Sequence, residues 1–423
     1  MKISILNGNP QESSFDAYLN QIQGQLEDKG SQVTNILLRE LPLKYCTGCW
    51  GCWVKTPGKC QADSASQEMD EAVINADFVL WAAPMKMGYP SKLLKMAMDK
   101  HLPLIHPYME VDQFEAHHLK RYVRYPRLGL VVEKEASTDD HDLQITTQMF
   151  QRTALNFKSG LYFSLTSETS ASEMVGTILN PSAKPLALPT TPRPTKGTAV
   201  TPVESITLFN GSPRGERGNS AIFLQKLAEG FGGESKMVNL VNINATAEHV
   251  QAFREAKAVW LAFPLYTDSM PGVVKHFIEA LEPLVGQKGN PPIGFIVQSG
   301  FPEGLHSRFV ERYLEKLADR LGSAYLGTIV KGNGEGVRIM PDNMNKKLFD
   351  GLLLLGNGLA KGETLNPATL ASIAKPESFP KVLAPVFKLF LKLPIAHSYF
   401  DSMLKQNGVY DKRFDRPFVK TDR

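Results

Sequence analysis

An approximate internal repeat constrains the fold of this 423-residue chain more than any other feature of its sequence. The early segment ISILNGNPQESSFDAYLNQIQG is matched after residue 204 by SITLFNGSPRGERGNSAIFLQKLAEG. Two further pairs follow in the same order: FVLWAAPMKMGYPSKLLKMAMDKHL with AVWLAFPLYTDSMPGVVKHFIEAL, and RLGLVVEKEASTD with PIGFIVQSGFPEG. The sequence therefore predicts a tandem duplication of one α/β unit.

Each copy alternates apolar strands with amphipathic helices, a pattern that specifies a parallel sheet covered by helices. In the first copy the predicted strands are KISILNGNP, QVTNILLREL, DFVLWAAP, RLGLVVEKE and GLYFSLTSE. We predict two doubly wound parallel sheets, in domains at residues 1–166 and 205–340. Between them, 167–204 is rich in Pro, Thr and Ser and predicts a linker. Residues 341–423 predict a C-terminal helical extension.

All four cysteines of the chain lie in one short segment, KYCTGCWGCWVKTPGKC, which is an insertion peculiar to the first copy. The spacing C-x2-C-x2-C-x7-C, at Cys46, Cys49, Cys52 and Cys60, suits thiolate ligands of an iron–sulfur cluster or of zinc. A structural zinc site usually draws its ligands as two separated pairs, which favours a four-iron, four-sulfur cluster here. A redox or disulfide role and an empty inherited loop are the alternatives.

Composition describes an ordinary globular protein. Hydrophobic residues make up 43% and charged residues 21% of the chain, and the formal net charge of +4 gives no reason to expect a nucleic-acid or membrane partner. The beginning, MKISILNGNP, has neither an apolar targeting region nor a cleavage site. We therefore expect a cytoplasmic protein whose thiols are reduced unless they bind metal.

Three loops carry a family resemblance. NGSPRGERGNS follows a strand, P-L-Y-x-x-S-M-P-G precedes a helix, and S-G-F-P-E follows the fourth strand of the second copy. Together they resemble the NADPH-dependent FMN reductase branch of the flavodoxin-like fold. With its cysteine segment, the first copy resembles the iron–sulfur flavoproteins of that branch. The resemblance implies FMN at the carboxyl ends of the strands, NAD(P)H as co-substrate, and dimerisation, which here predicts an internal pseudo-dimer or a further homo-oligomer.

In the second copy, the FMN phosphate is expected to be bound by serine hydroxyls, an asparagine amide, an arginine side chain and the N-terminus of a helix. The loop after its third strand is expected to run along the isoalloxazine ring, and the loop after its fourth strand to close the other side. The candidate FMN residues of this copy are Ser212, Arg214, Asn219, Ser220, Pro264, Leu265, Tyr266, Thr267, Asp268, Ser299, Gly300 and Glu303.

The first copy departs from the family pattern. Its first loop has no arginine and no Gly-Asn-Ser, and Glu133 and Glu135 are expected near the flavin position, where they disfavour an electron-rich reduced ring. Whether this copy binds FMN stays open at this point. Its candidate FMN residues are Asn9, Ser13, Ser14, Phe15, Pro84, Met85, Lys86, Met87 and Gly88.

The predicted function is an FMN-dependent NAD(P)H oxidoreductase or flavin reductase that exchanges electrons with small-molecule or redox-protein partners. If the cysteine segment holds an iron–sulfur cluster, the cluster is expected to relay electrons to the flavin. An electron carrier without a substrate of its own and a degenerate flavodoxin-like scaffold are the alternatives. The sequence singles out no catalytic residue. The His-rich and Arg-rich stretch 101–127 fits either a substrate cover or a basic solvated connection.

Overall fold

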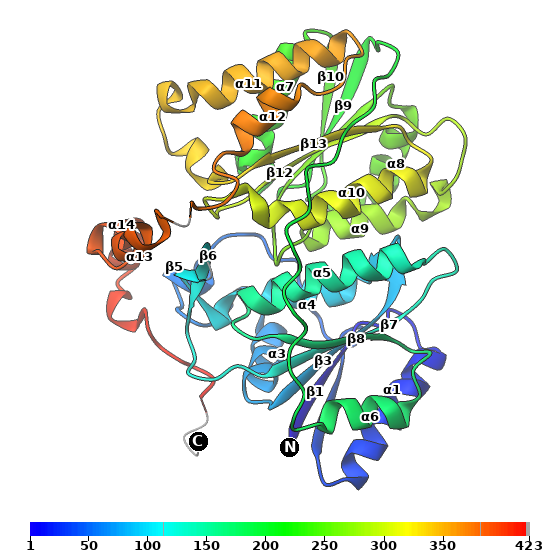
Figure 1. Cartoon of the computed structure of the whole chain (residues 1–423), viewed down its shortest axis with the longest axis vertical. Helices are drawn as coiled ribbons and strands as arrows, with labels where there is room; N and C mark the ends of the chain where they lie inside the picture. Colours follow the sequence, from blue (N-terminus) through cyan, green and yellow to red (C-terminus); the bar gives the residue numbers. More distant parts are fainter. Residues whose placement is uncertain (113, 381, 420–423) are drawn as a thin grey trace. The chain divides into compact units, whose positions relative to one another are not determined.

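A computed structural model describes residues 1–112, 114–380 and 382–419, which divide into two compact units. The first unit comprises Met1–Pro189 and the described part of the C-terminal segment that follows Pro380. The second unit comprises Thr190–Pro380. Each unit contains its own sheet, with helices on both faces (Figure 1).

The first unit is built on a sheet of order β2-β1-β3-β7-β8, in which these five strands run parallel and β4 adds an antiparallel edge to β3. The central strand β3 is buried along almost its whole length, as expected for a parallel strand covered on both faces. Strands β5 and β6 form a separate antiparallel hairpin. The elements are β1 Lys2–Asn7, α1 Ser14–Asp28, β2 Gln32–Leu37, α2 Gly51–Val54, α3 Ser64–Ile74, β3 Phe78–Lys86, β4 Tyr89–Pro90, α4 Lys92–Lys100, β5 Ile105–Asp112, β6 Glu115–Lys120, β7 Arg127–Glu133, α5 Asp140–Asn156, β8 Leu161–Thr166 and α6 Ala171–Leu179.

The second unit has a five-stranded parallel sheet of order β10-β9-β11-β12-β13. Its core joins the sheet to helix α7 and to the leucine-rich face of α11. Gly356 lets these two helices approach, because a Cβ there would lie 2.1 Å from the carbonyl oxygen of Leu227. The elements are β9 Ser205–Asn210, α7 Asn219–Phe231, β10 Glu234–Asn239, α8 Thr246–Glu255, β11 Val259–Pro264, α9 Gly272–Ala280, β12 Ile293–Gln298, α10 Arg308–Leu321, β13 Tyr325–Lys331, α11 Asp342–Ala360 and α12 Pro367–Ala374.

The predicted fold class is confirmed. Both units are α/β structures with parallel sheets, and their sheets share one strand order, in which the first strand lies between the second and the third. This order puts the first and third strands side by side, so that their following loops leave the same edge of the sheet. Tandem duplication and packing as an internal pseudo-dimer stay predictions.

The segment predicted as a linker, 167–204, differs from the prediction at its start. Helix α6 lies within it and packs beside α1, with Met174, Val175 and Ile178 buried in the core of the first unit. Ser170 caps the helix by accepting a hydrogen bond from the Glu173 backbone N–H. The short helix was missed because it is surrounded by Ser, Thr and Pro residues, which are typical of loops.

The predicted C-terminal extension, 341–423, also differs, because its parts pack in different units. Helices α11 and α12 complete the second unit, where α11 lies against α7. Helices α13 (Ala384–Phe390) and α14 (Pro394–Gln406) instead pack in the first unit. Local periodicity predicts such helices but not the surface that each one covers.

Candidate functional site

The first turn of helix α7 contains buried polar side-chain atoms without hydrogen-bond partners among the described residues. The helix begins after Gly218, and no side chain caps it. Ser220 is fully buried and its hydroxyl has no hydrogen-bond partner among the described residues, and the same holds for the side-chain oxygen of Asn219. The first N–H groups of a helix have no partner within the helix and attract anions. This turn therefore presents donors of the kind that bind a phosphate group.

The loop that precedes α7 packs so closely against neighbouring residues that two of its positions require glycine. A Cβ at Gly218 would lie 2.0 Å from the Ser212 hydroxyl oxygen, and a Cβ at Gly211 would lie 2.3 Å from a methyl carbon of Val274. The hydroxyl of Ser212 accepts a hydrogen bond from the Arg214 backbone N–H at 3.2 Å. The loop is thus compact, and Ser212 is buried in it.

Two residues that the sequence did not single out hold this loop in place. Glu335, in the turn after β13, pairs with the Arg214 guanidinium at 2.6 Å, so Arg214 already has a carboxylate partner. Arg338 donates hydrogen bonds to the carbonyl oxygens of Glu216 and Gly218, each at 3.1 Å. The Gly-rich segment KGNGEGVR directly after a strand was the signal that could have identified this clamp.

The loop after β11 contains a tight turn at the same edge of the sheet. Thr267 and Asp268 both have positive φ, at 43° and 56°. Tyr266 and Ser269 exchange backbone hydrogen bonds of 2.9 and 3.0 Å across the turn. Pro264 ends β11 itself. Two successive residues with positive φ are typical of a type I′ turn.

The loop after β12 adds the third side of the candidate site. Leu265 donates a backbone hydrogen bond to Gln298, at the end of β12, and this bond links the second and third loops. Gly300 is exposed, and a Cβ added there would meet no atom within 4 Å. Glu303 is fully buried and lies 3.6 Å from the ring nitrogen of His306. Glu303 therefore belongs to the interior beneath this loop, while Gly300 faces open space.

The corresponding first loop of the first unit is organised around Asp16. This residue lies in the first turn of α1, where Ser13 and Asp16 form a reciprocal capping box. The Asp16 carboxylate accepts hydrogen bonds from the side chains of Asn7 at 2.8 Å, Asn9 at 2.7 Å and Arg39 at 2.8 Å, and from the Ser13 backbone N–H at 3.0 Å. Asn9 and Ser13, both predicted to bind FMN, are thus engaged by a carboxylate.

A second carboxylate holds the turn after β3. Met87 and Gly88 have positive φ, at 53° and 74°, like the matching turn of the second unit. Their backbone N–H groups donate to the two oxygens of Glu135, at 3.0 and 2.7 Å. The other first-unit candidates lie nearby in sequence: Phe15 and Met85 are buried, Ser14 opens α1, and Pro84 and Lys86 belong to β3.

The cysteine segment lies between β2 and α3 and contains the short helix α2. The Cys49 sulfur accepts a hydrogen bond from the Gly51 backbone N–H at 3.4 Å, and the ammonium nitrogen of Lys100 lies 3.9 Å from the Cys60 sulfur. Burial raises the pKa of the Cys46 thiol to about 11 and raises the pKa of Cys52 as well. Among residues 1–112, 114–380 and 382–419, no three His, Cys, Asp or Glu side chains are placed to hold a metal ion. The donor types suit a cluster, and the Cys52 thiol lies near enough to Cys46, Cys49 and Cys60 for their charges to interact.

The C-terminal helix α14 covers this cysteine segment. Leu404 is fully buried in a cluster with Trp53, and Phe400 contacts Trp53 edge to face at 5.7 Å. The β5–β6 hairpin, which contains most of the His-rich stretch, packs in the same cluster. Buried beside it, the Arg121 guanidinium donates through Nη1 to the backbone carbonyls of Arg413 and Asp415, at 3.2 and 2.9 Å.

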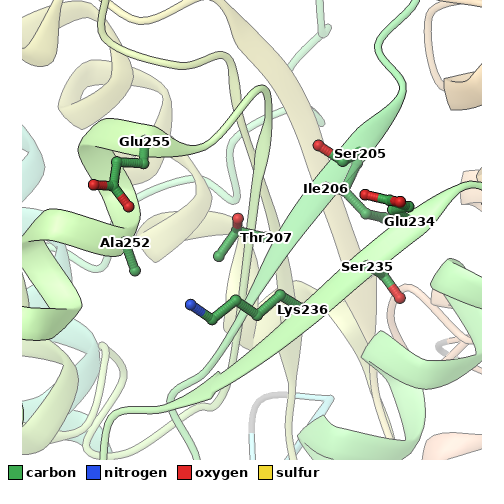
Figure 2. Close-up of a pocket in the computed structure, with 8 residues that line it drawn as sticks. All are labelled: Ser205, Ile206, Thr207, Glu234, Ser235, Lys236, Ala252 and Glu255. Carbon is green, nitrogen blue, oxygen red and sulfur yellow. The ribbon is translucent and has the colours of Figure 1, made fainter.

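A surface pocket lies elsewhere, at the edge of the second unit's sheet where strands begin (Figure 2). It is lined by the first residues of β9 and β10 and by the end of α8, and Lys236 extends from β10 toward α8. The candidate flavin loops leave the opposite ends of the strands. The pocket is therefore separate from the candidate site.

No helix of the described residues is long and apolar enough to cross a membrane.

Part of the first unit matches a known protein family. Residues 1–112 match the family model described as NADPH-dependent FMN reductase. The predicted family resemblance is confirmed for this part of the first copy, and for the second copy it stays a prediction. A curated iron–sulfur flavoprotein of Methanocaldococcus jannaschii is 29% identical over 105 residues, a match that covers 25% of this chain and 53% of that protein. The chain thus matches only about half the length of this relative.

Solved structures resemble the chain over less than half of its length. An azoreductase of Bacillus anthracis matches with 13% identity and a TM-score of 0.29, over 37% of this chain and 99% of that one. An NADH:FMN oxidoreductase in its apo form matches with 17% identity and a TM-score of 0.30, over 41% and 97%. An NAD(P)H:quinone oxidoreductase of Methanothermobacter marburgensis matches with 15% identity and a TM-score of 0.29, over 37% and 94%.

Proposed function

We propose that the chain is an FMN-dependent oxidoreductase that takes electrons from NAD(P)H, with its FMN in the second unit. The observation that carries this proposal is the uncapped first turn of α7 with the buried, unpartnered hydroxyl of Ser220. A buried polar group without a partner is costly, and in native proteins it usually marks a place where a ligand or water completes the structure. The family match supports a flavin-dependent oxidoreductase as the general class.

The residues of the second unit fit FMN in three places. Ser212, Ser220 and the backbone N–H groups at the start of α7 would hold the phosphate, with the guanidinium groups of Arg214 and Arg338 nearby. The Thr267–Asp268 turn and the open position at Gly300 would flank the flavin ring. Bound FMN would supply acceptance of hydride and release of single electrons. The protein residues bind the cofactor, orient the ring and exclude water from its buried face.

Ser220→Ala tests the proposal against a matched control. Loss of one hydrogen bond to a charged phosphate costs about 1.5–3 kcal/mol, so FMN affinity should fall by about tenfold to a hundredfold. Ser323→Ala removes another buried, unpartnered serine hydroxyl of the same unit, located just before β13 begins, and should leave affinity unchanged. The measurement is FMN fluorescence quenching on titration of the full chain. Equal affinity in both variants would refute the assignment.

Reduction kinetics separate the enzyme from an electron carrier. The FMN-loaded chain should be bleached by NADPH or NADH under anaerobic conditions and should recover its colour on addition of a quinone or free flavin. A chain that dithionite reduces but neither nicotinamide reduces would be a carrier. A chain that binds no FMN at all would leave the scaffold as the surviving alternative.

A four-iron, four-sulfur cluster in the cysteine segment is a second candidate component, and Arg121 is the observation that favours it. This guanidinium is 1% exposed, and its Nε and Nη2 groups have no partner among the described residues. It lies close enough to Cys52 for their charges to interact. A buried cation needs compensating negative charge, to which Asp415 contributes and neutral thiols do not. Metal-bound thiolates would supply it.

Anaerobic reconstitution with ferrous iron and sulfide tests this component. The wild-type chain should acquire iron, sulfide and visible cluster absorption, and Cys52→Ser should not. Arg121→Met should weaken cluster retention, whereas Arg124→Met, which changes a mostly exposed guanidinium paired with Asp77, should not. Uptake of zinc in place of iron, a disulfide, or no uptake by the wild-type chain would each reject the cluster in favour of the corresponding alternative.

A further inference from the structure

We propose that the first unit, although it matches the FMN reductase family, cannot hold FMN because its own carboxylates Asp16 and Glu135 fill the two anchoring positions. One flavin would then bind per chain, in the second unit. This inference rests on the proposed FMN site of the second unit. The two sheets share one strand order, so the same two positions can be compared between the units.

The first anchoring position is the start of the helix after the first strand. In the second unit this start has no side-chain cap, and Ser220 in its first turn offers a buried hydroxyl without a partner. In the first unit Asp16 lies in the first turn, and its carboxylate receives four hydrogen bonds. The donors suited to a phosphate are therefore already bound to an internal anion.

A phosphate approaching α1 would face this carboxylate as a like charge. The Asp16 carboxylate pairs with the Arg39 guanidinium, and the side chains of Asp16 and Arg39 are only 9% and 19% exposed. Burial alone would raise the pKa of Asp16, but the hydrogen bonds from Arg39, Asn7, Ser13 and Asn9 outweigh burial and lower it. The carboxylate is thus ionised at neutral pH, and repulsion of a dianionic phosphate is strong at this short range.

The second anchoring position is the turn after the third strand, whose backbone N–H groups would meet the polar edge of a flavin. In the first unit both N–H groups of Met87 and Gly88 are bound by Glu135, which lies two residues beyond β7. Two residues beyond β12, the matching position of the second unit is Gly300, where no side chain exists and the surrounding space is open. A carboxylate therefore occupies this position in the first unit, whereas glycine leaves the matching position of the second unit without a side chain.

Flavin stoichiometry of the full chain is the first test. Saturation with FMN, followed by desalting and measurement of flavin and protein, should give one FMN per chain. Two FMN per chain would overturn this inference while leaving the proposed site of the second unit intact. No FMN at all would overturn the proposed function first. These failures are thereby distinguishable.

Exchange of the carboxylate between the units is the second test. Ser220→Asp places in α7 the charge that α1 carries, and it should reduce FMN affinity at least a hundredfold and leave the chain without flavin. Retention of one FMN by this variant would place the flavin in the first unit and overturn the inference. Ser323→Asp, elsewhere in the second unit, controls for the introduction of a carboxylate, and circular dichroism confirms that both variants are folded.

The reverse exchange tests the stated cause. In the Ser220→Asp background, Asp16→Ser combined with Glu135→Gly should restore binding of one FMN, now in the first unit, with at least a tenfold gain in affinity. Asp16→Asn with Glu135→Gln provides a second, nearly isosteric pair that keeps the loops folded and should also raise affinity. If both pairs fold and neither gains affinity, the carboxylates are not what excludes flavin.

Discussion

Helix α14 should control the exposure of the cysteine segment, and Leu404→Ala tests this directly. Leu404 is 0% exposed and packs in one cluster with Trp53, Val54, Ile105 and Tyr108. Replacement of a fully buried leucine by alanine costs about 2–5 kcal/mol, and more where the surroundings cannot collapse into the cavity. Because two of these four neighbours are large aromatic side chains, we expect a loss of about 3 kcal/mol for the attachment of α14.

This loss has a direct consequence for thiol chemistry. Cys52 packs against the same cluster, whereas Cys49 is exposed. A loss of about 3 kcal/mol raises the population of the detached state roughly a hundredfold, because each 1.4 kcal/mol is a factor of ten. Labelling of Cys52 by iodoacetamide, followed by peptide mass spectrometry, should accelerate by about that factor. Labelling of Cys49 should stay fast in both proteins.

Leu393→Ala is the matched control, because Leu393 precedes the same helix but is 47% exposed. It should change the labelling rate and the unfolding midpoint by little, about 0.5 kcal/mol or less. Equal labelling of Cys52 in the two variants would refute the covering role of α14. A lower unfolding midpoint for Leu404→Ala with unchanged labelling would show that the helix stabilises the unit without protecting the thiol.

Three further predictions concern single side chains. Asp16→Asn should destabilise the first unit by about 1.5–3 kcal/mol at pH 7. Because the pKa of Asp16 is lowered in the folded state, the stability that its carboxylate contributes is fully present above the unfolded pKa near 3.9 and is lost as pH falls through the folded pKa. The difference in unfolding free energy between wild type and variant, measured with urea, should therefore be smaller at pH 3. Gly218→Ala, with its Cβ 2.0 Å from the Ser212 hydroxyl oxygen, should reduce FMN content while near-ultraviolet circular dichroism shows a folded second unit. Arg308→Met should lower the stability of the second unit by about 3–5 kcal/mol in thermal unfolding, because it leaves Glu311, 1% exposed, without the guanidinium that binds it at 2.7 Å.

Most of the α/β architecture was predictable because its causes are local in sequence. Runs such as FVLWAAP and AVWLAFP are apolar along their whole length, which specifies strands buried on both faces. The loops that follow the strands of a parallel sheet leave one edge, so the positions of the Ser212, Tyr266 and Ser299 loops followed from strand order alone. Helix α6 was less accessible, because its buried residues span only Ala171 to Ile178 among loop-forming residues.

The covering of the cysteine segment could not be predicted, because its contacts join residues that are far apart in sequence. The Trp50 ring, for example, contacts the ring of Phe400 in α14, with ring centroids 5.5 Å apart. Nothing in the local pattern of either segment specifies the other. The hydrogen bonds around Asp16 were partly predictable from the sequence. Serine followed three residues later by an acidic residue is a readable capping signal, and Ser13 with Asp16 fits it.

The contrast between Asp16 and Ser220 connects stability with function. A helix start after a parallel strand presents N–H groups that require partners, and a fold can supply them internally or leave them for a ligand. The first unit supplies a carboxylate and closes the position in the free protein. The second unit leaves a buried hydroxyl unsatisfied, a local violation that is expected where binding later compensates for it. For this reason the position that looks worse as structure, Ser220, is the better candidate for function.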